Sequence, residues 1–219
     1  MRMKKTVIIN RAVPGSGKTT ITKCILKALE EKNISSAIHS TDEYFMENGK
    51  YVFDVKKLKD FHDQNLVEFN ASLDKKVNVV ICDNTNLLPW QSEPYTNLAR
   101  KYDYQIIFIS LDPRDLEKHV LAQQVTIEKP DAHSVSREVL KEMIFEYHLF
   151  DSLLDKNSPI DSEKHFHYYW DDEICKKIST EKLAKHFDSD FVIRILPTEY
   201  KDFQRTIGQK VLALLKDKK

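Results

Sequence analysis

Glycine, lysine and threonine residues come together in one short run near the start of the chain. Two of the four glycines of the chain lie in this run, which reads Pro14-Gly15-Ser16-Gly17-Lys18-Thr19-Thr20. Glycine has no Cβ, so it can adopt a positive φ and let backbone N–H groups close around an anion. A helix that begins within the run would add the positive end of its dipole. The run therefore predicts a loop that binds phosphate groups.

The spacing of these residues is that of a Walker A loop, with Ala12 in place of the usual first glycine. In such a loop the lysine, here Lys18, reaches the β and γ phosphates of a nucleoside triphosphate, and the hydroxyl of Thr19 binds Mg²⁺. The backbone amides of the loop hold the phosphate oxygens. We expect residues 14–20 to bind ATP or GTP with Mg²⁺, and Lys18 to act in catalysis as well.

An acidic run follows the apolar residues 37–39 and reads Ser40-Thr41-Asp42-Glu43-Tyr44-Phe45. A kinase that phosphorylates a hydroxyl needs a carboxylate near the γ-phosphate, so Asp42 is a candidate general base. Aspartate is also a favoured helix cap, so residue type alone leaves both roles of Asp42 open. Glu43 is expected to be a solvated neighbour.

A second polar run, Asp83-Asn84-Thr85-Asn86, follows the apolar residues 77–82. Asp83 has the place of a Walker B aspartate, so it could hold Mg²⁺ through water or contact the acceptor. The same four residues are also typical of a turn. Ligands of open α/β sheets bind at the carboxyl ends of the strands, so both runs are expected at the edge of the sheet that binds ligands.

Apolar patterns predict strands and helices that alternate along the chain. Strands are expected over residues 6–10, 37–40, 77–82, 105–111 and 191–196. Helices are expected over residues 21–29, 56–73, 90–102, 113–124, 136–154 and 172–187, and again after residue 196. This alternation is typical of an α/β protein with a parallel sheet and right-handed crossovers.

The length and composition of the chain limit its class. A chain of 219 residues is long enough for one generous domain, and we expect a single domain over residues 1–219. Lys plus Arg and Asp plus Glu each number 34, so no net charge attracts nucleic acid or a membrane. No apolar run has the ~20 residues of a membrane span. Three scattered cysteines, Cys24, Cys82 and Cys175, favour a reduced compartment, by default the cytoplasm, over a disulfide framework or a zinc site.

Several stretches within residues 7–154 together resemble a known family. They are residues 11–20, 40–45, 48–53, 83–86, 94–95 and 135–138, with His62, Asn65 and Trp90. Their order and spacing resemble the P-loop kinases related to the kinase domain of phage polynucleotide kinase. Most of all they resemble the AAA-labelled group typified by the kinase-like domain of a Nedd-type ubiquitin-ligase-binding protein.

This resemblance implies a three-layer α/β/α P-loop NTPase fold, with a mostly parallel sheet of about five strands and a lid. The matched core would cover residues 1–154, with the lid near residues 124–135. Residues 155–219 would form a C-terminal extension with a final strand and helix.

The resemblance also implies roles for individual residues. It favours Asp42 as the general base, and it implies transfer of the γ-phosphoryl group of ATP or GTP. The leading acceptor is a 5′-hydroxyl of RNA or DNA. Asp83 then lies on the metal side with Thr19. The residues expected on the acceptor side are Tyr44, His62, Asn84, Thr85 and Asn86.

The chain departs from the family pattern in its lid. The family usually has one or two lid arginines where this chain reads Leu121-Ala122-Gln123-Gln124. Such an arginine neutralises charge on the phosphoryl group during transfer. Four other cations are candidates to replace it, namely Arg114, Lys118, Lys129 and Arg137. Phe45 also stands where the phage enzyme has an arginine that grips the substrate phosphate, which fits the Nedd-type group.

Three functions stay open on the sequence. The first is a P-loop kinase that acts on a polynucleotide 5′-hydroxyl, with weak intrinsic NTPase activity. The second keeps the fold but phosphorylates a small molecule, which the neutral net charge and Phe45 favour. The third is a nucleotide-binding regulatory or scaffold protein with little turnover, which Gln123 and Gln124 favour. No membrane is expected as a partner, and the sequence does not indicate a protein partner.

Overall fold

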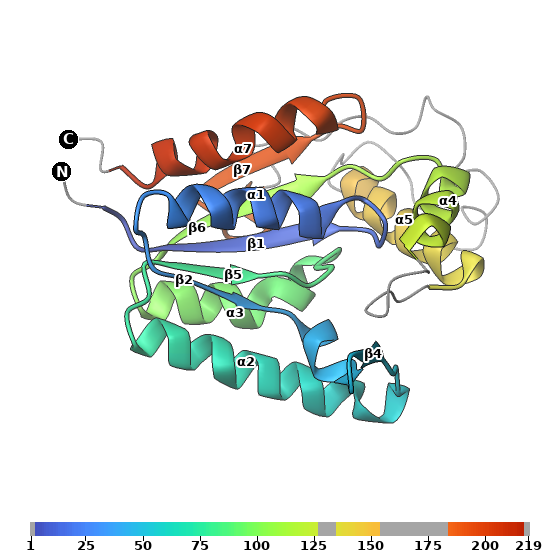
Figure 1. Cartoon of the computed structure of the whole chain (residues 1–219), viewed down its shortest axis with the longest axis horizontal. Helices are drawn as coiled ribbons and strands as arrows, with labels where there is room; N and C mark the ends of the chain where they lie inside the picture. The colour runs from blue at the N-terminus through green and yellow to red at the C-terminus, as the bar shows by residue number, and fades with distance from the viewer. Residues whose placement is uncertain (1–2, 127–134, 154–183, 217–219) are drawn as a thin grey trace.

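The computed structural model of the protein describes residues 3–126, 135–153 and 184–216. Five strands form one parallel sheet in the order β2-β5-β1-β6-β7 (Figure 1). The strands are β2 (Ser36–His39), β5 (Val79–Cys82), β1 (Thr6–Ala12), β6 (Gln105–Leu111) and β7 (Phe191–Ile195). The predicted α/β class with a mostly parallel sheet is therefore confirmed.

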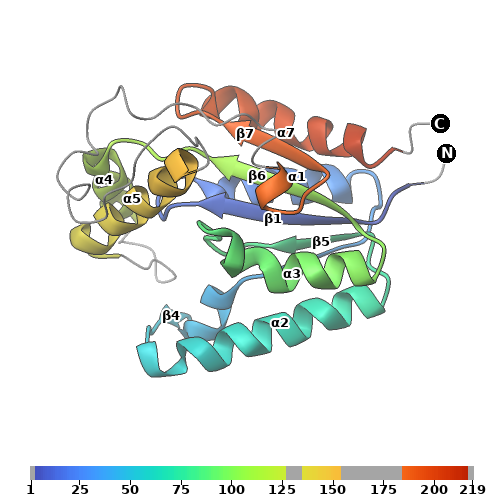
Figure 2. The ribbon, with the colours of Figure 1, turned by 180° about the vertical axis from the view of Figure 1, so that it is seen from behind.

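Helices cover both faces of the sheet, so the fold has three layers (Figures 1 and 2). One face carries α1 (Lys18–Glu30) and α7 (Tyr200–Leu214). The other face carries α2 (Leu58–Asp74) and α3 (Pro89–Lys101). Two further helices, α4 (Leu116–Thr126) and α5 (Arg137–Leu153), lie beyond the carboxyl ends of the strands.

The central strand β1 contributes to a different apolar core on each of its faces. Ile8 packs in the core under α1 and α7, whereas Val7 and Ile9 pack in the core under α2 and α3. Successive side chains of a strand point to opposite faces, so a strand that is buried on both faces reads as a continuous apolar run. A third cluster, which includes Val13 and Leu140, joins α5 to the end of β1. Val13, the first residue after β1, is therefore held in a core with α5.

Between β2 and α2 the structure has elements that apolar periodicity does not predict. Residues Thr41–Phe45 and Val55–Lys57 form two 3₁₀ helices, η1 and η2. Between them, β3 (Met46–Glu47) and β4 (Lys50–Tyr51) pair as an antiparallel hairpin. Strands this short show no period. The turn Asn48-Gly49 was the available signal, because its residues adopt φ values of 53° and 77°, which that pair favours.

Most predicted elements are present, with small shifts at their ends. The strand expected from residue 77 begins at Val79, and the helix expected from residue 113 begins at Leu116. Residues 127–134 of the predicted lid and residues 172–183 of a predicted helix lie outside the described residues. Within the three described ranges, no helix is both long and apolar enough to cross a membrane.

Candidate functional site

The predicted phosphate loop connects β1 to α1 at the carboxyl edge of the sheet (Figure 1). Gly15 and Gly17 have φ values of +81° and +88°, which residues with a Cβ rarely adopt. Ala12 is the last residue of β1 and is not among the described residues with positive φ. The backbone of the loop therefore explains why glycine stands at positions 15 and 17 and why alanine is tolerated at position 12.

The start of α1 is suited to an anion. No side chain caps this end of the helix, and its first turn contains no acidic residue. The partial positive charge of the first N–H groups therefore has no counter-charge within the helix. The buried hydroxyl of Ser16 also has no hydrogen-bond partner among the residues that the structure describes. Phosphate oxygens could accept hydrogen bonds from both kinds of donor.

Lys18 is the first residue of α1, and its side chain forms an ion pair with Asp83, the residue that follows β5. Its Nζ is 2.9 Å from Oδ1 of Asp83 and 2.7 Å from the carbonyl oxygen of the same residue. The side chains of Lys18 and Asp83 are only 14% and 6% exposed. Asn10 donates a further hydrogen bond of 2.6 Å to Oδ1 of Asp83. A cation for phosphate and an oxygen ligand for a metal thus lie side by side next to the loop.

The donor groups near the loop fit Mg²⁺. The exposed Thr19, in the first turn of α1, and Asp83 both offer oxygen, which is the ligand atom that Mg²⁺ prefers. Among the described residues, no group of three or more His, Cys, Asp or Glu side chains could hold a metal ion. Mg²⁺ is commonly bound by one or two protein oxygens together with substrate phosphates. The site therefore fits a metal ion that arrives with a nucleotide.

Asp42 lies in η1, after the end of β2. The Tyr51 hydroxyl donates a hydrogen bond of 3.3 Å to its Oδ1. Burial raises the pKa of Tyr51 above its ordinary value, and the charge of Asp42 raises it further, so the hydroxyl remains a donor at neutral pH. His62 Nδ1 is 3.0 Å from the Thr41 hydroxyl. Burial lowers the pKa of His62, whereas the Asp42 charge opposes that shift.

Glu43 is exposed, as expected of a solvated neighbour, and its charge also interacts with the other carboxylates of the site. Partial desolvation raises the pKa of Glu43, and the negative charges of Asp83 and then Asp42 raise it further. Three carboxylates from the ends of β2 and β5 therefore lie close enough to interact. Tyr44, the next residue, is half-buried and lies with its ring centroid 5.7 Å from that of Phe61.

Three residues expected on the acceptor side make contacts that join the strand ends. Oδ1 of Asn84 accepts a hydrogen bond of 2.9 Å from the backbone N–H of Thr41. The buried Asn86 donates a hydrogen bond of 2.8 Å to the carbonyl of Asn10. The carbonyl of Thr85 accepts one of 2.9 Å from the last residue of β1. These contacts fix the spacing of β1, β2 and β5 at the edge that carries Lys18.

The cations expected in the lid are differently placed. Lys118 and Arg137 each form an exposed ion pair with an acidic residue near the start of α4. Arg114 is half-buried and lies against an aromatic ring of α7. Lys129 lies outside the described residues. The structure thus brings Arg114 close to α7 and pairs Lys118 and Arg137 with carboxylates.

Gln123, in the segment where a lid arginine is usual, has a structural contact. Its Oε1 accepts a hydrogen bond of 2.7 Å from the N–H of Val135, and its Nε2 donates one of 3.4 Å to the carbonyl of Val135. The side chain is buried. These two bonds join α4 to Val135, two positions before the start of α5, so the glutamine links the two ends of the predicted lid.

Two residues that sequence reasoning missed contact the phosphate loop. His119 of α4 bonds to the carbonyl of Pro14 at 2.9 Å, and Tyr200 of α7 bonds to the carbonyl of Gly17 at 2.8 Å. Tyr200 is 183 positions away from Gly17 along the chain, so no local motif connects them. A histidine within the helix pattern at residues 113–124 was the one signal for His119, and it does not name a partner.

The stability of the protein is expected to decrease as the pH falls below about 6.5. Burial lowers the pKa of both His119 and His39 from the ordinary 6.5. The folded protein therefore keeps these rings neutral at a pH where the unfolded chain already binds protons. The free energy of unfolding then decreases as the pH falls from about 6.5 toward the lowered pKa of the folded state. Urea unfolding at about pH 7.5 and about pH 5.5 measures the difference. His119→Gln should show a smaller pH dependence, and an unchanged dependence would contradict the assignment to His119.

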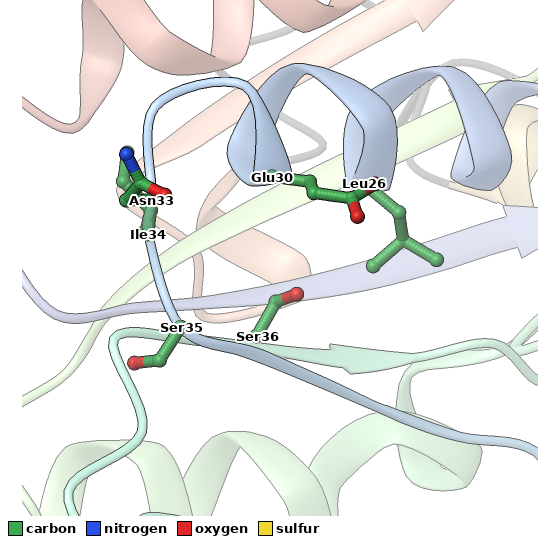
Figure 3. Close-up of a pocket in the computed structure, with 6 residues that line it drawn as sticks. All are labelled: Leu26, Glu30, Asn33, Ile34, Ser35 and Ser36. Carbon is green, nitrogen blue, oxygen red and sulfur yellow. The ribbon is translucent and has the colours of Figure 1, made fainter.

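A separate pocket lies at the opposite edge of the sheet (Figure 3). It has a volume of about 490 Å³ and is lined by Leu26, Glu30, Asn33, Ile34, Ser35 and Ser36. These residues belong to the last turns of α1, the connection that follows it and the start of β2. The phosphate loop precedes the first turn of α1, at the other end of that helix. The pocket is therefore not part of the candidate site.

The fold and the loop define the class of the protein. A parallel sheet whose central strand leads through a glycine-containing loop into a helix is typical of P-loop nucleotide-binding proteins. Carboxylates at the ends of neighbouring strands are a feature of the kinase-like members. The protein therefore has a P-loop kinase-like fold. A family model described as "Chromatin associated protein KTI12" matches residues 6–209, and the chain belongs to this KTI12 family.

Known proteins agree with this assignment. Human NEDD4-binding protein 2 is 34% identical over 153 residues, which are 67% of this chain but only 8% of that protein. The structure of Chaetomium thermophilum Kti12 in complex with ADP-AlF3 has a TM-score of 0.59 and 10% identity, and the match covers 96% of this chain and 100% of that one. A chain of the Pnkp1/Rnl/Hen1 RNA repair complex has a TM-score of 0.54 and 14% identity, over 68% of this chain and 46% of that one. The resemblance to the P-loop kinase group is therefore confirmed, and the two structures show a shared fold.

Proposed function

We propose that the protein is an ATP-dependent P-loop phosphotransferase that moves a γ-phosphoryl group to a hydroxyl acceptor. The observation that carries this proposal is the ion pair of Lys18 with Asp83 beside the phosphate loop, with Asp42 and Glu43 after the neighbouring strand β2. Residues 14–20 would bind the phosphates of ATP. Mg²⁺, held by Thr19 and Asp83, would neutralise phosphate charge.

Asp42 is the proposed general base. As the acceptor oxygen forms its bond to the γ-phosphorus, Asp42 would take the hydroxyl proton, and ADP would leave with the electrons of the broken P–O bond. The hydrogen bond from Tyr51, 3.3 Å long, helps to fix the orientation of the Asp42 carboxylate. Lys18 would stabilise the charge that develops on the transferred group.

A 5′-hydroxyl of a polynucleotide is the leading candidate for the acceptor. The support comes from Phe53, whose side chain is 56% exposed and whose ring lies 5.0 Å from that of Phe45 in η1. An exposed ring that packs against η1, the element that carries Asp42, can stack on a nucleobase near the reacting end. A small-molecule acceptor remains the alternative, which the neutral net charge of the chain favours.

Asp42→Asn should abolish phosphoryl transfer while ATP still binds. Removal of a general base reduces turnover by about 10²- to 10⁴-fold, whereas the phosphate loop is untouched. The assay is transfer of γ-labelled phosphate from ATP with Mg²⁺ to 5′-hydroxyl RNA and DNA, beside a metabolite pool from a cell extract. ATP affinity is measured by calorimetry. Asp54→Asn is the matched control, because Asp54 only caps η2 at the surface.

The outcomes separate the alternatives. Transfer to the oligonucleotide that Asp42→Asn removes supports a polynucleotide kinase with Asp42 as base. Transfer only to metabolites replaces the polynucleotide with a small-molecule acceptor. Transfer that survives Asp42→Asn would move the role of the base to another group, for which Glu43 is the neighbouring carboxylate.

A nucleotide-binding regulator with little turnover is the second candidate. The lid favours it, because Lys118 and Arg137 are paired with carboxylates and Gln123 serves a structural contact. In that case ATP would bind without measurable transfer, and the bound nucleotide would control contact with a partner. High ATP affinity together with no detectable transfer of phosphate to any acceptor in the assay would support this candidate.

Two broader predictions accompany the proposal. Residues 1–219 are proposed to act as one domain, because β7 joins the same sheet as β1 and α7 packs in the same core as α1. A cytoplasmic location is proposed because Cys24 and Cys82 are free thiols. The description of the family as chromatin associated adds chromatin as a second location to examine.

A further inference from the structure

Two carbonyl groups of the phosphate loop are bound by side chains from outside the loop. The hydroxyl of Tyr200 donates a hydrogen bond of 2.8 Å to the carbonyl of Gly17. Nε2 of His119 accepts a hydrogen bond of 2.8 Å from the backbone N–H of Arg114. The neutral ring must then carry its proton on Nδ1, from which it donates to the carbonyl of Pro14, 2.9 Å away.

The loop also packs tightly against both side chains. A Cβ at Gly15 would lie 3.3 Å from Nδ1 of His119, and a Cβ at Gly17 would lie 2.0 Å from the hydroxyl oxygen of Tyr200. Neither contact depends on a charged surface group, because His119 is buried and Tyr200 is half-buried. The loop is therefore enclosed from the side of α4 and from the side of α7.

The two contacts are joined to each other through Arg114. The backbone of Arg114 bonds to His119, and its guanidinium carbon lies 5.3 Å from the centroid of the Tyr200 ring, within the range of a cation–π contact. A continuous path of contacts thus runs from Pro14 through His119, Arg114 and Tyr200 back to Gly17. We call Arg114, His119 and Tyr200 the bracket.

The bracket helps to fix the direction of the N–H groups that would face phosphate. A peptide unit is planar and trans, so its C=O and N–H point in opposite directions. When Tyr200 holds the carbonyl of Gly17, the N–H of Lys18 points in the opposite direction within the same peptide plane. His119 has the same effect on the N–H of Gly15 through the carbonyl of Pro14. The carbonyl of Gly17 also accepts hydrogen bonds of 3.1 Å and 3.2 Å from the backbone N–H groups of Thr20 and Ile21, so Tyr200 adds to a carbonyl that the start of α1 already holds. The carbonyl of Pro14 is bound by His119. Side chains outside the loop therefore contribute to the geometry of the anion site.

We propose that the bracket holds the phosphate loop in its binding conformation and that Tyr200, Arg114 and His119 are positioning residues for nucleotide. The C-terminal helix α7 is then part of the nucleotide site, although it lies outside the stretches that carry the kinase resemblance. This inference rests on the proposed binding of nucleotide at residues 14–20. Loss of the bracket should weaken ATP and ADP by the same factor, because it disturbs the whole loop.

Tyr200→Phe tests the bracket with the smallest possible change. Loss of one hydrogen bond should weaken ATP and ADP binding by about two- to tenfold, as measured by calorimetry with Mg²⁺ on the full chain. Tyr104→Phe is the matched control, because the Tyr104 hydroxyl also donates to a backbone carbonyl, that of Val77 at 2.7 Å, away from the loop. Urea unfolding of both variants separates an effect on the loop from an effect on stability. Equal nucleotide affinity of the two variants would overturn the proposal.

Arg114→Gln tests whether the contacts act as a unit. This change removes the guanidinium from the Tyr200 ring and keeps the backbone N–H that bonds to His119. The double variant Arg114→Gln/Tyr200→Phe should lose less affinity than the product of the single losses, because the guanidinium acts on the Gly17 carbonyl through the position of the Tyr200 hydroxyl. Independent effects would overturn the coupling. If Lys18→Ala also leaves ATP affinity unchanged, the nucleotide site itself is wrong, whereas loss of affinity in Lys18→Ala alone rejects only the bracket.

Discussion

Lys18→Ala is expected to weaken ATP binding by about 10- to 100-fold, which is the range for a lost hydrogen bond to a charged group. The ammonium group lies beside the loop, 2.9 Å from Oδ1 of Asp83. Without it the Asp83 carboxylate has no lysine beside it and would repel the phosphates, which adds to the loss. ADP should be affected less than ATP, because the lysine of a Walker A loop reaches the β and γ phosphates. Calorimetric titration with both nucleotides measures the two effects.

The control for this prediction is Lys23→Ala, an exposed lysine on the same helix but outside the loop. The variant Lys18→Ala should remain folded, because Asn10 still donates its hydrogen bond of 2.6 Å to Asp83. Unfolding curves for both variants establish this. Equal ATP affinity in Lys18→Ala and Lys23→Ala would mean that residues 14–20 do not bind the triphosphate.

Gly17→Ala should remove nucleotide binding and destabilise the fold by about 2 to 4 kcal/mol, the sum of backbone strain and overpacking. The added Cβ would lie 2.0 Å from the hydroxyl oxygen of Tyr200 and 2.3 Å from its Cζ. The φ of +88° is also unfavourable for alanine. Tyr200 must therefore move away, and the carbonyl of Gly17 keeps only its backbone donors from Thr20 and Ile21. Urea unfolding and nucleotide titration measure the two consequences.

Gly49→Ala separates the strain of the backbone from the collision with Tyr200. Gly49 has a φ of +77°, and a Cβ there would meet no atom within 4 Å. Its replacement should therefore carry only the conformational cost, about 1 to 2 kcal/mol. The double variant Gly17→Ala/Tyr200→Ala removes the obstacle and should be destabilised less by the alanine at position 17. Equal losses for Gly17→Ala and Gly49→Ala would show that the collision does not matter.

The sequence predicted the central βα unit because its signals are local. The apolar residues of β1 and the glycines that follow them belong to adjacent positions, and each has a direct physical meaning for backbone or burial. The position of Asp42 and Asp83 at one edge also followed, because parallel strands bring their carboxyl ends together. The kinase-like fold could therefore be inferred from residues that are close together in the sequence or lie at the same end of parallel strands.

Contacts between distant segments could not be predicted in this way. Arg11 is charged and lies within β1, yet it is fully buried, with Nε bonded to the carbonyl of Leu87 at 3.0 Å. Its guanidinium carbon lies 3.7 Å from the centroid of the Tyr147 ring. Partners such as these, like Tyr200 for Gly17, come from segments that only the folded topology brings together. No spacing rule in one sequence identifies them.

The order of the strands places the two sides of the site in different parts of the chain. β2, with η1 and the hairpin that follows it, forms one edge of the sheet, and β7 with α7 forms the other, with β1 between them. Part of the acceptor side, with Tyr44 and Phe53, therefore comes from the segment of residues 41–57, whereas the proposed contacts with nucleotide come from the centre of the sheet and the far edge. Residues 43–57 could be exchanged for the corresponding segment of a relative, with Asp42 kept. The resulting chimaera would inherit a new acceptor while its nucleotide chemistry stayed the same.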